Sequence, residues 1–347
     1  MSGNKISEQK FRDYFSGSFG AKKDSVLTTP KFGVDVSIIS INDALAMCSA
    51  SDPLTYIPGL GAEKSAWLSV HLTANDIATT SVAPQYFQVV LNLPQYMTEE
   101  EFQDYWQHIH RFCKEASIAI TGGHTAFVPN QNSTISGGGT MFAVAEKHQL
   151  MTSEMAMEDD VLIMTKKAAI ISVAVLGLQF PNQMKRIFGE TKKDYFEELF
   201  FQTSVLEEAK IAQQINKENK VISAMHDITE GGVLGAVYEF CTASGLGVEL
   251  NLDNVPIDDT QIEVCRYFNL SPYEIIGAGS MLMTVKPSFA EKVLEIYERN
   301  NISATIIGKM QSPKKGKIAI QNNLKTELKY PEKDPYWEAF ANAFEYE

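Results

Sequence analysis

Residues 63–93, EKSAWLSVHLTANDIATTSVAPQYFQVVLNL, decide the fold class because a helical pattern is followed directly by a strand pattern. From Ala66 onward, apolar residues recur three or four positions apart, which predicts an amphipathic helix over 63–82 that stops before Pro84. The following run, 86–93, is rich in β-branched and aromatic residues and predicts a strand. Helices that alternate with strands favour an α/β fold over an all-β sandwich.

The alternation extends along the rest of the chain. Upstream, the strand-like runs 34–40 and 44–50 flank Asn42-Asp43, a turn signal, and predict a hairpin. Downstream, Thr98 and Glu101 match a capping box that opens a helix ending near residue 116. The same patterns predict strands at 118–121, 133–147, 161–165, 221–224 and 247–252, and helices at 7–15, 195–217 and after the turn 226–232 as far as 243.

The length of the chain predicts two domains. A single hydrophobic core usually stops growing before a chain reaches 347 residues. A polar connection at 151–160 separates the two alternating halves, so the expected domains are residues 1–155 and residues 156–347.

Composition restricts the classes of partner and the compartment. A formal net charge of −13 lacks the basic surface that nucleic acid or an anionic membrane requires. The four cysteines, Cys48, Cys113, Cys241 and Cys265, are far apart and form no CxxC pair, which indicates reduced thiols in a cytoplasmic protein. The first fifteen residues are too polar for a signal peptide, and no apolar run is long enough to span a membrane.

Three aspartates of the first domain are candidate magnesium ligands. Asp35 lies beside the first strand, Asp52 follows the second, and Asp76 lies inside the helix in Asn75-Asp76-Ile77-Ala78, where aspartate is unfavourable unless something holds it. Two carboxylates about 4 Å apart repel by about 4 kcal/mol at an effective dielectric of about 20, so converging aspartates need a cation. Magnesium suits oxygen ligands. Three separately solvated aspartates are the alternative, because spacing alone does not establish convergence.

Glycine-rich segments add capacity for phosphate binding. Thr121-Gly122-Gly123-His124-Thr125 follows a predicted strand, and its glycines would let backbone N–H groups approach an anion, although a generic turn is the alternative. The segment 226–232, HDITEGG, directs acidic residues and glycines to the carboxyl end of a strand, with Thr229 as the expected N-cap of the next helix. The loop Gly277–Met281 allows either a ligand contact or close packing.

Taken in order, these segments resemble the AIR synthase superfamily, which includes HypE, selenophosphate synthetase and thiamine-monophosphate kinase. The ordered set is more specific than any one segment. It comprises Gly33-Val34-Asp35, Ser51-Asp52-Pro53, Asn75-Asp76-Ile77-Ala78, Thr121–Thr125, Thr165-Lys166, His226–Gly232 and Gly277–Met281.

The resemblance implies a two-domain PurM-like fold, with an N-terminal domain that forms a β-barrel across a homodimer interface and a C-terminal α/β domain. It implies an enzyme that binds ATP and Mg²⁺ in the cleft and phosphorylates an oxygen of a small-molecule substrate. By resemblance, the magnesium ligands are Asp35, Asp52 and Asp76, and the other cofactor-binding residues are Asn75, Gly122, Gly123, Thr125 and Lys166. The catalytic candidates are Asp227, which would face the substrate, His226 and His124.

Departures from the family pattern leave the reaction open. His124 stands where the family commonly has Asp or Glu, which removes one anionic ligand. True HypE proteins end in a cysteine that carries the group being dehydrated, whereas this chain ends Phe344-Glu345-Tyr346-Glu347. The DGVGTK-type signature of AIR synthase is also missing. The expected activity is HypE-like and ATP-dependent, and the alternatives are phosphoribosylformylglycinamidine cyclo-ligase itself and a nucleotide-binding scaffold without catalysis.

Overall fold

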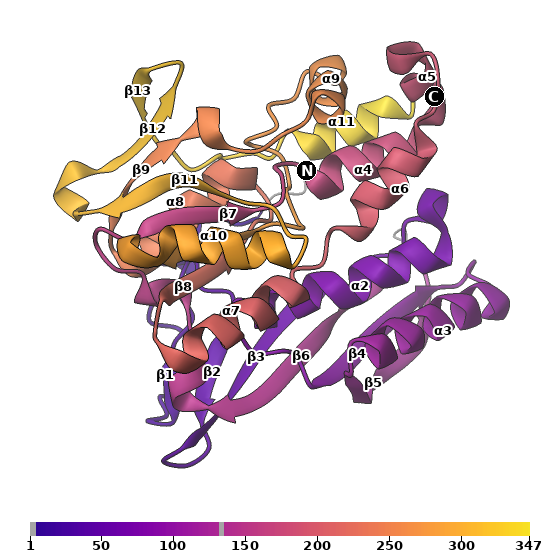
Figure 1. Ribbon diagram of the computed structural model, residues 1–347. Coiled ribbons are helices and arrows are strands. Elements are labelled where there is room, and N and C mark those ends of the chain that lie inside the picture. The colour runs from indigo at the N-terminus through magenta and orange to yellow at the C-terminus, as the bar shows by residue number, and fades with distance from the viewer. Residues whose placement is uncertain (1–4, 132–134) are drawn as a thin grey trace.

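The computed structural model describes residues 5–131 and 135–347 and shows a mixed α/β protein of two domains (Figure 1). Each domain has its own sheet, which confirms the predicted fold class. Residues 1–4, and residues 133–134 at the start of the predicted strand 133–147, lie outside the described residues. Within the described part of the chain, no helix combines the length and the apolar character that crossing a membrane requires.

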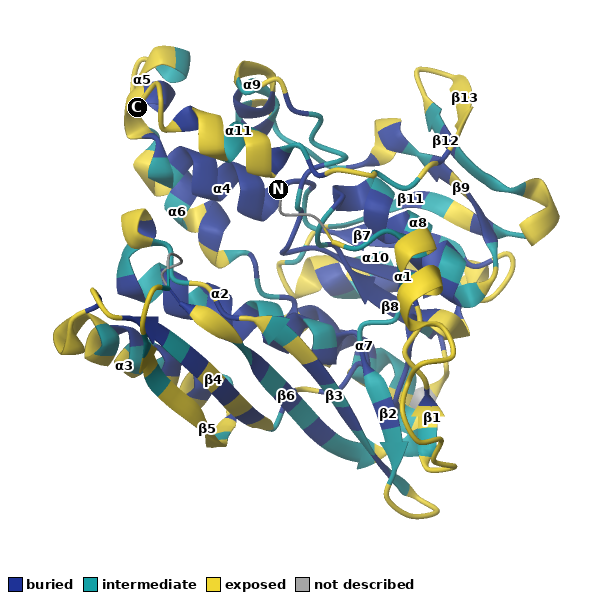
Figure 2. Cartoon of the chain, turned by 180° about the vertical axis from the view of Figure 1, so that it is seen from behind, coloured by how far each residue is buried: buried dark blue, intermediate teal, exposed yellow. Residues whose placement is uncertain are grey.

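The N-terminal domain is built on a six-stranded sheet with the order β1-β2-β3-β6-β4-β5. Its strands are β1 (Val26–Thr28), β2 (Ser37–Ser40), β3 (Leu45–Pro53), β4 (Tyr86–Pro94), β5 (Ala119–Val128) and β6 (Ser136–Glu146). Helices α2 (Gly61–Ala78) and α3 (Glu99–Glu115) pack together against one face of this sheet (Figure 1). On the other face, β4 and β5 carry exposed residues, visible in the view from behind (Figure 2).

The C-terminal domain is built on a seven-stranded sheet with the order β13-β12-β9-β11-β7-β10-β8. Its strands are β7 (Val161–Thr165), β8 (Ile222–Asp227), β9 (Gly247–Asn251), β10 (Met281–Val285), β11 (Ala304–Gln311), β12 (Lys317–Gln321) and β13 (Leu324–Glu327). Its helices are α4 (Ile170–Gln179), α5 (Pro181–Phe188), α6 (Lys193–Phe201), α7 (Leu206–Glu218), α8 (Gly232–Ser244), α9 (Asp259–Tyr267), α10 (Ala290–Arg299) and α11 (Tyr336–Ala343). The N-terminal helix α1 (Glu8–Phe15) reaches across to this domain, where Tyr238 of α8 donates a hydrogen bond to Glu8 at 3.1 Å.

Helix α2 is shared between the two domains. Ala66, Val70 and Ala74 pack into the core of the N-terminal sheet. Leu68 instead belongs to a cluster with α4 residues of the C-terminal domain. Because α2 is buried on two sides, it fixes the position of one domain against the other (Figure 1), and Asp76 belongs to its last turns.

Several predicted elements are confirmed with small shifts in their bounds. The hairpin of β2 and β3 pairs antiparallel around the Asn42-Asp43 turn. The capping box is present, with the Thr98 hydroxyl accepting from Glu101 N and the Glu101 carboxylate accepting from Thr98 N. The helix predicted over 63–82 spans α2, four residues shorter at its C-terminal end.

Other predictions were wrong. The helix predicted at 195–217 is two helices, α6 and α7, because the connection between them is held by Asn75, whose amide donates to Thr203 O at 2.8 Å and accepts from Val205 N at 2.9 Å. Thr229 is not the N-cap of α8; that position is Gly231, whose φ of 76° suits glycine. The segment 121–125 is not a turn, since it continues β5 in parallel pairing with β4.

The N-terminal sheet is open. Among the described strands, β1 and β5 lie at the two ends of the order, so one chain forms no closed barrel. The barrel implied by the resemblance would therefore need a second copy of the chain.

Candidate functional site

An acidic cavity of about 610 Å³ lies between the two domains. Its lining includes Asp35, Asp52 and Asp76 from the N-terminal domain and Asp227 from the C-terminal domain. Four aspartates distant in sequence therefore share one space, and the alternative of three separately solvated carboxylates does not describe this molecule. We refer to this space as the acidic cavity.

Each aspartate owes its position to the end of an element. Asp35 lies just before β2, and Asp52 lies near the end of β3, which extends three residues beyond the predicted strand, through Pro53. Asp76 lies near the end of α2, and Asp227 is the last residue of β8. These element ends meet because α2 packs across β3 and touches β8.

The carboxylates influence one another strongly. Burial and the Glu230 carboxylate raise the pKa of Asp52 to about 7. Burial and the Asp35 carboxylate likewise raise the pKa of Asp227 to about 7. Burial and the nearby carboxylates, chiefly Asp227, hold the pKa of Asp76 well above its usual value. Fewer of these carboxyl groups are therefore ionised at neutral pH than four free aspartates would be. A bound cation would favour their ionised forms.

His226 connects the cavity to a chain of buried charges. Its Nδ1 lies 2.5 Å from Asp35 Oδ2, and its Nε2 lies 3.4 Å from Glu239 Oε2. Glu239 in turn accepts from Lys5 Nζ at 2.9 Å and from the Tyr330 hydroxyl at 2.9 Å. Burial opposes the imidazolium, but the carboxylates of Asp35 and Glu239 outweigh burial and raise the pKa of His226 to about 10. The imidazole is therefore charged at neutral pH.

The geometry fits a divalent cation held by oxygen atoms. Ligand atoms of Asp35, His226 and Asp227 lie within 4.8 Å of one another. A protonated imidazole cannot coordinate a metal, so the carboxylates of this group are the usable ligands. Among the described residues, Asp227 Oδ1 is buried and has no hydrogen-bond partner, which leaves it available. Oxygen ligands of this kind suit Mg²⁺.

The same cavity carries cations and rings on its N-terminal side. Lys5 and Lys31 line it, together with Phe11 and Phe32, whose ring centroids are 6.5 Å apart. Burial opposes the charge on Lys5, but the Glu239 and Asp35 carboxylates outweigh burial and raise its pKa. Lys31 Nζ donates to Glu154 Oε1 at 3.0 Å and to Ala243 O at 2.6 Å, and Lys5 Nζ donates to Glu239, so either ammonium group would exchange one of these contacts for a phosphate oxygen.

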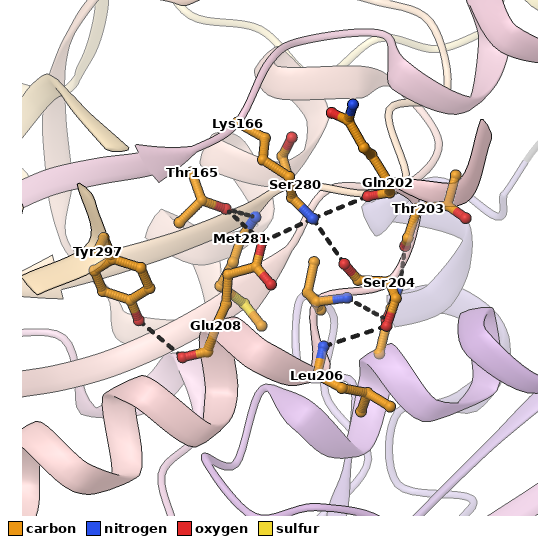
Figure 3. A network of polar contacts seen from close by, with 12 residues as sticks. Thr165, Lys166, Gln202, Thr203, Ser204, Leu206, Glu208, Ser280, Met281 and Tyr297 are labelled. Atoms are coloured by element: carbon orange, nitrogen blue, oxygen red, sulfur yellow. Dashed lines mark hydrogen bonds and ion pairs between the residues drawn. The ribbon is translucent and has the colours of Figure 1, made fainter. Parts of the chain in front are cut away.

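Two predicted cofactor-binding residues have structural contacts instead. Asn75 is fully buried, and both ends of its amide bind the segment between α6 and α7. Lys166 directs its Nζ to Glu208 Oε1 at 2.7 Å and to the carbonyl oxygens of Gln202 and Ser204 at 2.9 and 2.7 Å (Figure 3). Neither residue lines the acidic cavity.

The candidates at 122–125 lie on strand β5, far from Asp52 within one chain. Asp52 on β3 is opposite Gly139 on β6, which is opposite Val89 on β4, which is opposite Gly123 on β5. Three strand spacings separate Asp52 from Gly123, a distance of about 14 Å. Gly122, Gly123, His124 and Thr125 are exposed on this strand and do not line the acidic cavity.

Several residues of the site were missed by the sequence analysis. Lys5, Glu230 and Glu239 lie in or beside the cavity, although only Glu230 belongs to a segment that was considered for ligand binding. A lysine in a polar N-terminal segment carries no local signal. The one available signal was Glu239 within an otherwise apolar helical run, where a charge is expected to be buried only with a partner.

Fold and site together define a two-domain α/β protein with an acidic cavity between its domains that suits a divalent cation. The chain belongs to the AIR synthase related protein family. The family's N-terminal domain matches residues 33–145 and its C-terminal domain matches residues 158–321.

The relatives are distant but cover most of the chain. A putative hydrogenase expression/formation protein of Methanocaldococcus jannaschii is 25% identical over 257 residues, which are 72% of this chain and 71% of the relative. The selenide, water dikinase of the same organism is 23% identical over 246 residues, 68% of each chain. The carbamoyl dehydratase HypE of Escherichia coli is 24% identical over 306 residues, 86% of this chain and 85% of the relative.

A solved structure agrees on the fold. The hydrogenase maturation protein HypE in complex with ATP superposes with a TM-score of 0.67 at 17% identity, covering 97% of this chain and 98% of that chain.

Proposed function

We propose that this protein is an ATP-dependent enzyme that, with Mg²⁺, transfers a phosphoryl group from ATP to an oxygen of a small substrate. The observation that carries the proposal is the convergence of Asp35, Asp52, Asp76 and Asp227 in one cavity beside Lys5 and Lys31. Carboxylates without a cation would repel one another there, as the raised pKa values of Asp52 and Asp227 indicate. Phosphoryl transfer depends mainly on positioning and on neutralising phosphate charge, which such a site supplies.

Different residues would bind the metal and accept the proton. Asp35, Asp52 and Asp76 would hold the metal, which when bound neutralises charge on the phosphate oxygens. Asp227 lies across the cavity, and its pKa of about 7 suits a group that accepts a proton from the acceptor at neutral pH. His226 would act on Asp35, by holding that carboxylate in place through the 2.5 Å contact.

The names of the relatives support this class of reaction. HypE is named as a carbamoyl dehydratase and one structure of it contains ATP, and another relative is a dikinase. The relatives act on different substrates, so they support ATP use and leave the acceptor open. The cyclo-ligase alternative has its own test, because it predicts ADP release when formylglycinamidine ribonucleotide is added.

We also propose that the protein forms a homodimer through the β5 side of its N-terminal sheet. Strand β5 lies at an end of the strand order, and Tyr86, Val90 and Phe127 are exposed on β4 and β5. Pairing there would cover these side chains and would give His124, Gly122, Gly123 and Thr125 a partner to contact. Sedimentation analysis of wild type and Phe127→Asp tests this: a monomeric wild-type protein contradicts the proposal.

The decisive experiment on function is a thermal-shift titration with ATP and MgCl₂. A ligand at 100 times its dissociation constant stabilises a protein by about 2.7 kcal/mol. Asp76→Asn should lose most of that stabilisation without losing its fold, because the neutral amide removes a repelled carboxylate. Asp43→Asn, in the exposed turn between β2 and β3, is the matched control and should respond like wild type. Equal shifts in all three proteins would remove Asp76 from the site.

Turnover separates the enzyme from the scaffold alternative. The proposed enzyme releases ADP from ATP once a suitable acceptor is present, and Asp227→Asn should abolish that release while retaining part of the thermal shift. Binding of ATP without release of ADP under any acceptor would instead favour a nucleotide-binding scaffold.

A further inference from the structure

A second cavity, of about 440 Å³, adjoins the acidic cavity and differs from it in chemistry. It lies between α2 and residues 53–59 on one side and α4 and α11 on the other, and none of its lining residues is charged. Its walls are largely aliphatic and aromatic and include Trp337 and Phe340 of α11 together with Ile57 and Leu68. We call this space the apolar compartment.

The two cavities adjoin and share part of their walls. Pro53, Leu72, Ile276 and Trp337 line both of them. A ligand of moderate size can therefore place an apolar part in the apolar compartment and a polar part beside the aspartates. Sites for small molecules commonly combine apolar walls with a few placed polar groups in this way.

One polar group in the apolar compartment is left without a partner. Gln179, the last residue of α4, lines the compartment, and its Oε1 is buried without a hydrogen-bond partner among the described residues. The amide is packed closely against Gly59, where an added Cβ would lie 2.1 Å from Nε2. A buried acceptor without a partner costs about 1–3 kcal/mol, which a ligand that donates a hydrogen bond would recover once the amide turns from Gly59 toward the compartment.

The wall formed by α11 is held in place by the rest of the C-terminal domain. Gln183 of α5 donates to Ala343 O at 2.7 Å. The Phe180 ring lies 5.4 Å from the Phe340 ring and 5.0 Å from the Phe344 ring, centroid to centroid. The compartment is therefore formed before a ligand enters, which limits the entropy lost on binding.

We propose that the apolar compartment binds a flat, uncharged ring of the acceptor substrate, with one N–H or O–H donor directed at Gln179, while the group to be phosphorylated reaches the acidic cavity. This inference rests on the proposed function, which assigns phosphoryl transfer to the acidic cavity. No described residue that lines the compartment is a cation, so a phosphate group would meet no opposite charge there. The acidic cavity has its own cations, Lys5 and Lys31, and its own rings, Phe11 and Phe32, for the nucleotide.

Indole and 1-methylindole are suitable probes, because they share a flat ring and differ in the N–H donor. Binding is measured by ligand-observed NMR titration of the full chain. Wild type should bind indole at least fivefold more tightly than 1-methylindole, and Gln179→Leu should reduce that preference to less than twofold. Trp337→Ala should weaken both probes at least fivefold.

Controls separate this inference from a general loss of structure. Tyr267→Ala removes an aromatic residue of similar exposure, 43% against 38% for Trp337, outside both cavities and should bind both probes like wild type. Gln179→Leu, at a residue that lines only the apolar compartment, should retain the thermal shift with ATP and MgCl₂. Loss of that shift in wild type would overturn the proposed function, whereas the indole result tests the compartment independently.

Three results would overturn the inference. If indole does not bind the wild-type protein, the compartment does not bind a ring of this kind. Equal binding to Trp337→Ala and Tyr267→Ala places indole elsewhere on the protein. Displacement of indole by adenosine, which carries the nucleobase without phosphates, would assign the compartment to the nucleotide and not to the acceptor.

Discussion

His226 Nδ1 lies 2.5 Å from Asp35 Oδ2, although the two residues are 191 positions apart and belong to different domains. The contact places a cation of strand β8 directly behind a carboxylate of the acidic cavity. Through Glu239 it continues to Lys5, so a line of alternating charges runs from the C-terminal domain to the N-terminal segment. The position of Asp35 in the cavity therefore depends on both domains.

Removing the imidazole should destabilise the whole protein. In His226→Gln the carboxylates of Asp35 and Glu239 lose their shared cation while they stay buried, since the side chains are only 11% and 1% exposed. Breaking a buried charge pair on one side costs about 3–5 kcal/mol. The free energy of unfolding, measured in urea at pH 7, should fall by that amount.

The control for His226 is an exposed histidine with a similar partner. His148 lies 3.1 Å from Glu146, and its side chain is 68% exposed. His148→Gln should change the free energy of unfolding by less than about 0.5 kcal/mol, because exposed ion pairs contribute little. Losses of equal size in the two variants would mean that burial of the His226 cluster has no energetic role.

Local patterns were enough to predict much of the fold. Strand alternation located β4, and the pair Thr98 and Glu101 located the start of α3, because both features are complete within a few residues. The division of the predicted helix 195–217 could not be read locally, since it depends on Asn75, more than a hundred positions away, binding the backbone of Thr203. The generic turn that was the alternative at 121–125 does not form, because glycine also occurs in an edge strand.

The candidate site was also predictable in part, where a residue could be recognised from its local position in the sequence. Asp35, Asp52 and Asp76 could be selected because each lies at or near the end of a predicted element, and element ends gather at domain boundaries. Lys166 was selected by resemblance alone, and its contacts depend on the tertiary position of Glu208. Lys5 could not be selected, because its role comes from where the N-terminal segment crosses to the other domain.

His71 should make stability sensitive to acid. Burial and the Lys166 ammonium lower the pKa of His71 to about 3, below the usual value near 6.5. Below pH 6.5 the unfolded chain therefore binds a proton that the folded protein does not, so this histidine reduces stability as pH falls. Relative to His71→Phe, which keeps a ring stacked on Trp67, wild type should lose about 2 kcal/mol more between pH 7 and pH 5.

The pH experiment compares slopes and not absolute stabilities. The raised pKa values of Asp52 and Asp227 act in the opposite direction, because the folded protein then keeps protons that the unfolded chain releases between about pH 4 and pH 7. Their contribution is common to wild type and His71→Phe and cancels in the difference. His110→Gln, at an exposed position of α3, should keep the wild-type slope, and parallel slopes for all three proteins would exclude a role for His71.

Lys166 gives the sharpest test of a residue whose function was assigned by resemblance. Lys166→Met leaves the Glu208 carboxylate, 2% exposed, without its cation and removes a donor from two carbonyl oxygens, so unfolding should become easier by about 3–5 kcal/mol. Affinity for ATP with Mg²⁺, measured by calorimetry at 15 °C on folded protein, should change by less than twofold, because Lys166 does not line the acidic cavity.

The double variant Lys166→Met/Glu208→Met should recover most of the lost stability, since an apolar pair often replaces a buried ion pair without cost. A tenfold loss of ATP affinity in both variants would show instead that the ammonium group of Lys166 binds the nucleotide.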